Sequence, residues 1–472
     1  MNQNNELICV VDTDPKIAAA ISTATEKLCQ DLNLAYLHAH SLNELDQYLA
    51  KDENNAQRLA LLVLSSDCIQ HLNPDELKKI QILYQTNMIL TCFEDPLKPL
   101  KKTDTWPVEN IIYKPFDPAI LQEHLHFALV KNEKIKTSAV HSSPEKNVIE
   151  KIRRQYFLQL SEIGFSIESV FSYQFNTAYK FYHLSFVDQK KSSQWVKLLS
   201  KKNNVYEFVF CSPTQTVITH LREKSAASKA KIKNAYWPGY EKNRMITDPV
   251  ICVQMTDPED FERLKDFFSR KFPKSQIIEF PTTPPKDKLK CDLMICENEF
   301  TSEQINFVFK TDPLYFRISN DPFPDRASTE KTLSKETLRL AKPIDRNYLG
   351  RMINSFFPSC VESDPNPEHW FHLPDPALHS EMIEVNELSE AAFIYQNDRI
   401  LPRGEFQEFA LTQDDETELK PIKAKIQFAD STPDIENKYL HQVVFFGIRD
   451  DMLKKIRLWM LQTHIDHKKS GT

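Results

Sequence analysis

Glycine is scarce in this chain. Only 6 of its 472 residues are Gly, whereas an average protein has roughly 7%. Loops that hold phosphate groups need glycine where the backbone approaches the ligand closely or takes a positive φ. The chain contains no Walker loop, no GxGxxG fingerprint and no GGDEF-type loop. We therefore do not expect the nucleotide chemistry that depends on such loops.

Paired cysteines and long apolar runs are also missing. The nine Cys residues include no CxxC pair, so we expect reduced, buried thiols and no disulfide framework. No apolar run approaches the ~18–20 residues of a membrane helix. The N-terminus "MNQNNELICVVD" has no signal segment. The expected location is the cytoplasm, without membrane insertion.

A repeated phrase indicates a duplication. "ICVVDTDP" (8–15) returns as "ICVQMTDP" (251–258), with Met255 in place of Asp12. Further landmarks recur in the same order at offsets of 228 or 235 residues: Lys114-Pro115 with Lys342-Pro343, "LSEIGF" (160–165) with "LSEAAF" (388–393), and "EFVFCSPTQTVITHLRE" (207–223) with "QVVFFGIRDDMLKKIRL" (442–458). Because the order never changes, we interpret the chain as a duplicated two-domain unit.

The two members of this unit have different patterns. The first, at 1–135 and 248–358, contains near-continuous apolar runs such as "RLALLVLSS", with helical segments between them. Such runs are typical of parallel strands buried on both faces, so we expect a flavodoxin-like, doubly wound sheet. The second member, at 145–245 and 365–468, has aromatic and β-branched runs and a closing helix, expected at 214–235 in the first copy. That pattern predicts a small antiparallel β-barrel.

Residues 6–131 resemble a response-regulator receiver domain. That family has an acidic pair after its first strand, an acceptor Asp after the third, Ser or Thr after the fourth and Lys-Pro after the fifth. The residues that match are Asp12, Asp14, Thr91 and Lys114. Ser65 stands at the acceptor position. The resemblance implies a pocket for phosphoryl transfer and Mg²⁺, but a Ser hydroxyl with no adjacent base is a poor nucleophile, so we expect a degenerate phosphoacceptor pocket.

Residues 248–358 resemble a second receiver that has lost more of the pattern. Met255 replaces an acid and leaves Asp257, Glu297 stands at the acceptor position, and Lys342 is retained. A Met side chain does not bind Mg²⁺, which prefers oxygen ligands. We therefore expect a second degenerate pocket, with no metal and no other cofactor.

Residues 145–245 and 365–468 resemble PilZ domains, six-stranded barrels that bind cyclic di-GMP. The family motif is an Arg-x-x-x-Arg arm followed by Asp/Asn-x-Ser-x-x-Gly. Its remnants here are Arg153, Arg154, Ser161, Gly164 and Ser389. The two arginines are adjacent, so they could not fork around a guanine and its phosphates as the family pair does. Binding of cyclic di-GMP in the family manner is therefore not expected.

One part of the chain is basic. Residues 145–245 contain 17 Lys and Arg against 8 Asp and Glu, within a chain of net charge −7. The segment 222–244 concentrates this charge and adds Tyr236, Trp237 and Tyr240. It is either a solvated helix end and linker, or a surface for an acidic partner or nucleic acid.

We therefore predict a non-catalytic signalling or scaffold protein of bacterial type that acts through a protein partner. By analogy with receivers, a homodimer or an intramolecular receiver pair would use the face of the fourth and fifth helices and the fifth strand. Two alternatives stay open. One is an effector that is phosphorylated at Asp67 or binds cyclic di-GMP through other contacts; the other is a nucleic-acid binder that uses 222–244.

Overall fold

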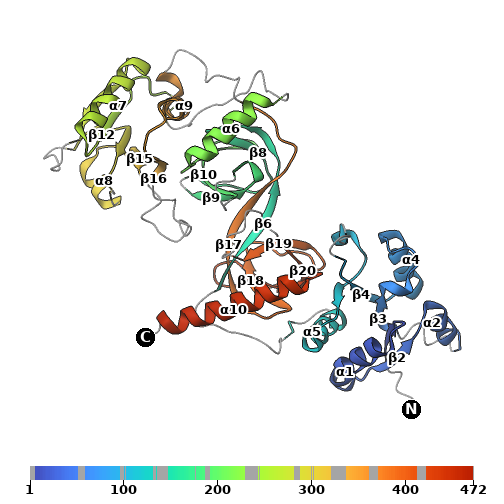
Figure 1. Ribbon diagram of the computed structural model, residues 1–472. Coiled ribbons are helices and arrows are strands. Elements are labelled where there is room, and N and C mark those ends of the chain that lie inside the picture. Colours follow the sequence, from blue (N-terminus) through green and yellow to red (C-terminus); the bar gives the residue numbers. More distant parts are fainter. Residues whose placement is uncertain are drawn as a thin grey trace. The chain divides into compact units, whose positions relative to one another are not determined.

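The structure of the protein is a computed structural model (Figure 1). It describes residues 6–51, 59–95, 100, 102–130, 134–135, 147–175, 177–186, 192–228, 243, 245–280, 288–298, 300, 302–319, 336–360, 370–411 and 421–470. The chain divides into two compact units. Unit 1 comprises Met1–Ile152, Met382–Asp414 and Lys420–Thr472, and unit 2 comprises Arg153–Glu381 and Asp415–Leu419.

Unit 1 contains a five-stranded parallel sheet with the strand order β2-β1-β3-β4-β5. Its elements in chain order are β1 (Leu7–Val11), α1 (Pro15–Asp31), β2 (Ala35–Ala39), α2 (Leu42–Leu49), β3 (Leu59–Ser65), α4 (Pro74–Tyr84), β4 (Asn87–Phe93), β5 (Asn110–Lys114) and α5 (Pro118–Leu129). Apolar side chains of α1 and α5 pack with Ile8 and Val10 of β1. Those of α2 and α4 pack with Cys9 and Val11. The sheet is therefore buried on both faces, as its apolar runs predict.

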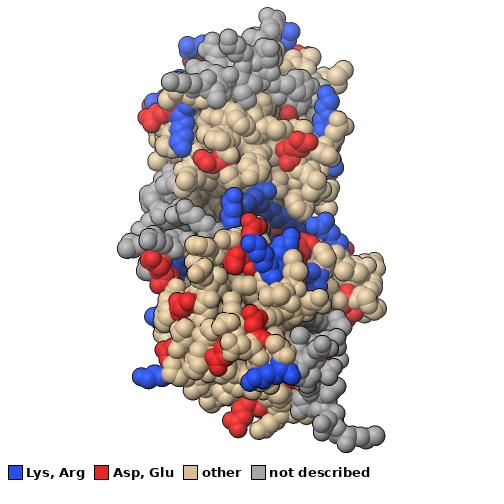
Figure 2. Space-filling view, turned by 90° about the vertical axis from the view of Figure 1, so that its right-hand side faces the viewer, with Lys and Arg blue, Asp and Glu red and all other residues tan. Residues whose placement is uncertain are grey.

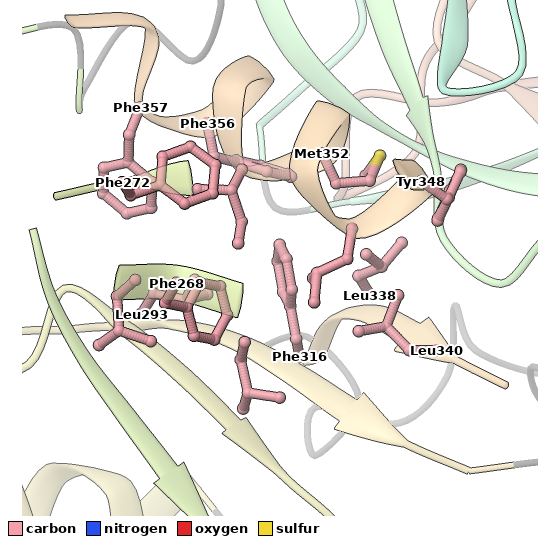
Figure 3. Close-up of a cluster of buried hydrophobic side chains, with 14 of the residues drawn as sticks. Phe268, Phe272, Leu293, Phe316, Leu338, Leu340, Tyr348, Met352, Phe356 and Phe357 are labelled. Atoms are coloured by element: carbon pink, nitrogen blue, oxygen red, sulfur yellow. The ribbon is translucent and has the colours of Figure 1, made fainter. Parts of the chain in front are cut away.

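Unit 2 contains a second parallel sheet with the order β13-β12-β14-β15-β16, which is the same topology. Its elements are β12 (Val250–Gln254), α7 (Pro258–Lys271), β13 (Gln276–Glu279), β14 (Leu293–Cys296), α8 (Ser302–Val308), β15 (Leu314–Ile318), β16 (Glu336–Leu340) and α9 (Arg346–Phe356). Figure 3 shows its aromatic core, in which Phe268 of α7 and Phe356 of α9 lie over Phe316 of β15. The same cluster includes Val209, from the antiparallel sheet of unit 2, and Ile218, from the helix that follows that sheet.

An antiparallel barrel of six strands completes unit 1. Its order is β18-β21-β20-β19-β6-β17, and it closes because β17 also pairs with β18. The strands are β6 (Asn147–Gln155), β17 (Ala377–Leu388), β18 (Ala392–Asn397), β19 (Phe406–Leu411), β20 (Ile422–Ala429) and β21 (Tyr439–Phe445), followed by α10 (Asp450–Ser470). Unit boundaries at residues 152/153 and 381/382 fall inside β6 and β17, so each of these strands belongs to both units.

Unit 2 has the corresponding antiparallel sheet, in the order β17-β9-β10-β11-β8-β7. Its further elements are β7 (Phe157–Leu160), β8 (Gly164–Glu168), β9 (Ala178–Tyr182), β10 (Ser193–Lys202), β11 (Val205–Phe210) and α6 (Gln215–Ala227). The closing helix ends at Ala227, and residues 229–235 of its expected range lie outside the described residues.

The expected combination of parallel α/β sheets with an antiparallel barrel is confirmed. The nine cysteines carry free thiols, and Cys29 and Cys68 are the two that are not fully buried. None of the helices in the described part of the chain combines the length and apolar character needed to cross a membrane. The predicted domain limits 145–245 and 365–468 differ from the boundaries of the two units, because residues 149–152 pair with β19 and belong to unit 1.

Candidate functional site

The pocket predicted in unit 1 forms at the carboxyl edge of its sheet. Asp12 follows β1, Ser65 ends β3 and Lys114 ends β5, and parallel strands bring these ends to one edge. Lys114 Nζ donates to Asp12 Oδ2 at 2.8 Å and to Ser65 Oγ at 2.8 Å. Relative exposures are 1% for Asp12, 0% for Ser65 and 4% for Lys114. The ammonium group is thus buried between a carboxylate and the hydroxyl at the acceptor position.

Two other predicted members of this pocket have different surroundings. Asp14 is the N-cap of α1, and its Oδ1 accepts from Lys16 N at 2.8 Å. Thr91 lies opposite Ser65 in the β3–β4 register. Its buried Oγ1 has no hydrogen-bond partner among the residues that the structure describes. Asp14 therefore serves the helix, while Thr91 belongs to the pocket wall.

Asp67 reaches the same pocket from outside. It lies in the short 3-10 helix Ser66–Cys68, and its side chain is 46% exposed. Its Oδ2 accepts from Ser65 Oγ at 3.2 Å and lies 3.5 Å from Lys114 Nζ. The sequence places Asp67 two residues beyond the end of β3. In the structure, the 3-10 turn after β3 brings its carboxylate back to Lys114.

The residues of this pocket do not fit the Mg²⁺ that receivers hold. Asp12 is already neutralised by Lys114, Asp14 caps a helix, and the acceptor position offers a hydroxyl. No group of three His, Cys, Asp or Glu side chains that could hold a metal occurs in the described ranges. No catalytic step through a metal follows from this arrangement.

The second pocket has a different ion pair. Glu297, at the acceptor position after β14, pairs with Lys342, which follows β16. Lys342 Nζ also lies 3.2 Å from Asp260 Oδ2, and Thr256 N donates to Glu297 Oε2 at 2.6 Å. The Lys342 side chain is 40% exposed, in contrast to buried Lys114. Burial alone raises the pKa of Glu297, but hydrogen bonds from Lys342 and Thr256 outweigh it and lower that pKa.

The repeated phrase has a structural explanation. Asp14 and Asp257 are the N-caps of α1 and α7, and each is followed by proline at the first helical position. Both strands that precede these caps are buried. Met255 is partly buried against the apolar core of unit 2, where Asp12 in unit 1 contacts Lys114. The retained letters therefore belong to a strand and a helix cap. Of the two changed letters, Val11 becomes Gln254 and Asp12 becomes Met255, and the second change removes the ion-pair partner.

The PilZ-like serines lie in buried turns. Ser161 Oγ accepts from Ile163 N at 3.2 Å, and Ser389 Oγ accepts from Ala391 N at 3.2 Å. A Cβ atom on Gly164 would lie 1.9 Å from the backbone oxygen of Phe208, so close strand packing requires glycine there. These residues are satisfied by the barrel itself.

The two arginines before this turn point in different directions. Arg153 pairs with Glu381 and lies 4.1 Å from the ring centre of Phe171. Arg154 is its neighbour in β6 and is exposed. Adjacent residues of a strand face opposite sides, so the structure does not bring the two guanidinium groups together.

Sequence reasoning missed an Arg contact that occurs once in each unit. In unit 2, Arg222 of α6 binds Glu162 of the barrel turn and Asp345, the N-cap of α9, at 2.7 Å from Asp345 Oδ2. In unit 1, Arg457 of α10 binds Glu390 at 2.6 Å and Asp117, the N-cap of α5, at 2.9 Å. We call these contacts the Asp–Arg–Glu clamps. Their signal was present, because the offsets of 228 and 235 residues relate all three positions.

In both clamps the contacts favour the ionised forms of the aspartate and arginine side chains. Burial raises the pKa of Asp345, but hydrogen bonds from Arg222 and the backbone lower it by more. The pKa of Asp117 is lowered in the same way, against its burial, by Arg457 and backbone amides. Hydrogen bonding to Glu390 raises the pKa of Arg457. Each clamp joins a helix N-terminus of a parallel sheet to a barrel turn.

Further contacts attach the barrel of unit 1 to β5 and α5. Asn110 Nδ2 donates to Phe445 O at 2.8 Å, and Gly447 N donates to Asn110 Oδ1 at 3.0 Å. Gln427 Nε2 donates to Phe127 O at 2.6 Å. The β5–α5 part of the face suggested for receiver pairing is therefore in contact with the barrel.

Much of the basic segment lies outside the described residues. In Figure 2 the Lys and Arg side chains are accompanied by acidic ones. Of the segment 222–244, residues 229–242 and 244 lie outside the described residues, so the nucleic-acid alternative concerns positions that the structure does not describe.

No protein-family model and no curated protein matches the chain. Among solved structures, a receiver domain of an HD domain-containing protein from Pseudomonas fluorescens is 23% identical, covering 26% of this chain and 94% of its own, with a TM-score of 0.22. A receiver domain protein from Clostridium thermocellum (16% identity, 26% and 94% covered) and a response regulator from Thermotoga maritima (16%, 26% and 98%) also have TM-scores of 0.22. Matches at this level assign no role to any residue.

Proposed function

We propose that this chain is a non-catalytic signalling scaffold in which two degenerate receiver-like domains dock on two PilZ-like barrels without phosphorylation. The observation that carries this proposal is the clamp found in each unit. The barrel turn that would hold cyclic di-GMP in the resembled family is fixed on a receiver-like sheet instead. Glu162 in that turn is 2% exposed and is bound by Arg222 and Arg351.

The pockets of the two sheets support the same proposal. Neither has an aspartate at the acceptor position: Ser65 binds Lys114 in one, and Glu297 binds Lys342 in the other. In a receiver, the lysine stabilises a phosphoryl group on the acceptor carboxylate. Here each lysine has its partners within the chain, which suits a sheet that keeps one conformation.

Calorimetric titration with cyclic di-GMP tests the barrel part of the proposal. We expect no saturable heat from the full chain up to millimolar ligand. Micromolar binding would contradict the proposal and would make the chain a second-messenger effector. If no heat is observed, the next experiment is capture of partners from a cell extract, with the Arg222→Ala and Arg457→Ala variants as controls, to identify what the scaffold binds.

Phosphorylation at Asp67 is the second candidate, and the 3.5 Å distance from Asp67 Oδ2 to Lys114 Nζ favours it. Incubation with acetyl phosphate and Mg²⁺ followed by intact mass spectrometry distinguishes the two. The scaffold proposal expects no phosphoryl mass on the natural chain. A mass increase that disappears in Asp67→Asn but persists in Asp14→Asn would establish the second candidate, and Ser65→Asp serves as the attempt to restore an acceptor.

A further inference from the structure

Each unit is assembled from both halves of the sequence. In unit 1, β19 pairs with β6, with Phe409 opposite Lys151. In unit 2, β9 pairs with β17, with Phe181 opposite His379. If the repeats were self-contained, β9 would pair with β6, and β19 would pair with β17. The first part of the long strand of each repeat is therefore exchanged, at 149–152 and 378–380, while its last part stays paired with its own repeat.

The receiver-like sheets follow the same exchange. The sheet at the start of the chain contacts the last barrel in unit 1, and the sheet after residue 248 contacts the barrel that precedes it in unit 2. The clamps show that the contact is equivalent in both cases. Asp117 and Asp345, Glu390 and Glu162, and Arg457 and Arg222 occupy matching places in the two repeats.

We propose that the chain is the single-chain equivalent of a strand-exchanged homodimer. Each barrel is completed by a strand of the other repeat, and each receiver-like sheet docks on the barrel of the other repeat. The partner of each docking surface is thus another part of this chain. Arg222 and Arg457 are the positioning residues of this contact. The inference rests on the duplication but needs neither the loss of phosphorylation nor the loss of nucleotide binding.

Zero-length cross-linking of the intact chain tests the exchange directly. A carbodiimide adds no spacer, so it joins a lysine to a carboxylate only when the two groups can come into direct contact. Lys134 lies 2.7 Å from Glu387, and Lys423 lies 2.9 Å from Asp104. Both pairs connect the first repeat to the second. We expect both links by mass spectrometry in the monomeric fraction of a dilute sample.

A local pair provides the matched control for cross-linking. Lys454 and Asp450 lie one helical turn apart in α10, at 2.7 Å. If this control link forms while both links between the repeats are absent, the exchange is wrong. If the links between the repeats occur only in dimeric fractions, the exchange takes place between two chains, and the proposal for a single chain is overturned.

Cutting the chain between the repeats tests what holds them together. A specific protease site inserted within 229–242 allows the purified full chain to be cleaved after folding. We expect the two fragments to elute together at the size of the intact chain and to separate only in denaturant. Separation under native conditions would overturn the proposal.

The clamp variants assign the positioning role. Arg222→Ala should raise the dissociation constant of the cleaved fragments by about tenfold or more, because it removes the ion pair to Asp345 on the other fragment and leaves buried Glu162 with Arg351 alone. Arg457→Ala should have a smaller effect, since its side chain is 41% exposed. Charge-preserving lysine variants should recover part of each loss. The control is Arg263→Ala, which removes ion pairs on the exposed surface of α7. An equal rise in the dissociation constant for this variant would show that the clamps do not position the fragments.

Discussion

The two receiver-like pockets show which features of such a sheet can change independently. In unit 1 the charges of Asp12 and Lys114 are buried, whereas in unit 2 Glu297 and Lys342 form a partly exposed pair and Met255 joins the core. The helix cap beside each pocket and the clamp to the barrel are the same in both. Pocket chemistry differs between the units while the cap and the clamp do not, which is what we expect if docking, as proposed above, is the task common to both.

The largest expected effect comes from copying the second pocket into the first. Asp12→Met leaves Lys114 charged and buried, with the partly exposed carboxylate of Asp67 at 3.5 Å as its remaining acidic partner. We therefore expect unit 1 to lose about 3 kcal/mol, the lower end for a broken buried ion pair. Denaturant unfolding followed by hydrogen exchange in β1 and β5 measures the change for this unit alone. Asp12→Met combined with Lys114→Met should recover most of the stability, because apolar replacement of a buried ion pair is often tolerated. A double variant as unstable as the single one would contradict this account.

The next comparison concerns the barrel turns. Gly164→Ala forces a Cβ atom against the backbone of Phe208 and should destabilise unit 2 by about 3 kcal/mol or more. The equivalent residue in unit 1 is already Ala392, so Ala392→Gly should cost only about 1 kcal/mol. Unfolding curves of both variants, read by hydrogen exchange in β8 and β18, measure the difference. Equal losses would show that Gly164 is not retained for strand packing.

The sequence predicted the sheets well and their connections poorly. Apolar runs such as 59–65 predicted parallel strands, and the offset of 228 residues matched Lys114 with Lys342. Strand exchange was not predictable, because β6 and β17 carry the same pattern and can pair with either barrel. The position of Asp67 depended on the turn after β3, which spacing along the chain does not specify.

Acidification should destabilise both units, in part through buried His124 in unit 1 and buried His379 in unit 2. Desolvation lowers the pKa of His124 in unit 1 to about 4 and that of His379 in unit 2 to about 3. Both folded pKa values lie below the ordinary value near 6.5. Between pH 6.5 and the folded pKa, each histidine binds a proton in the unfolded chain but not in the folded one, so the free energy of unfolding falls as pH falls through this range. By pH 5 each histidine should cost about 2 kcal/mol.

Single replacements assign this pH dependence to each unit. His379→Phe should remove only its own share from unit 2, because buried His183, whose pKa is also lowered to about 4, stays in place. The His379 imidazole lies among Phe181, Tyr173 and Tyr179, and its Nε2 has no hydrogen-bond partner among the described residues. His124→Phe should remove its own share from unit 1, with an added loss at neutral pH from the 2.9 Å contact to Asn110. Melting between pH 7 and 5 measures both, and an unchanged slope in His379→Phe would point to other titrating groups.

The smallest effect should come from breaking the second pocket. Glu297→Gln removes the charge that Lys342 binds, but Lys342 is exposed enough to be solvated and keeps Asp260, so unit 2 should lose less than about 1 kcal/mol. Because the pKa of Glu297 is lowered in the folded chain, its contribution is present above the ordinary pKa of glutamate and disappears as pH falls through the folded value. Melting of Glu297→Gln and the natural chain should therefore converge in acid. A loss as large as that of Asp12→Met at neutral pH would mean that the second pocket stabilises its unit as much as the first. That result would contradict the contrast drawn here between the two pockets.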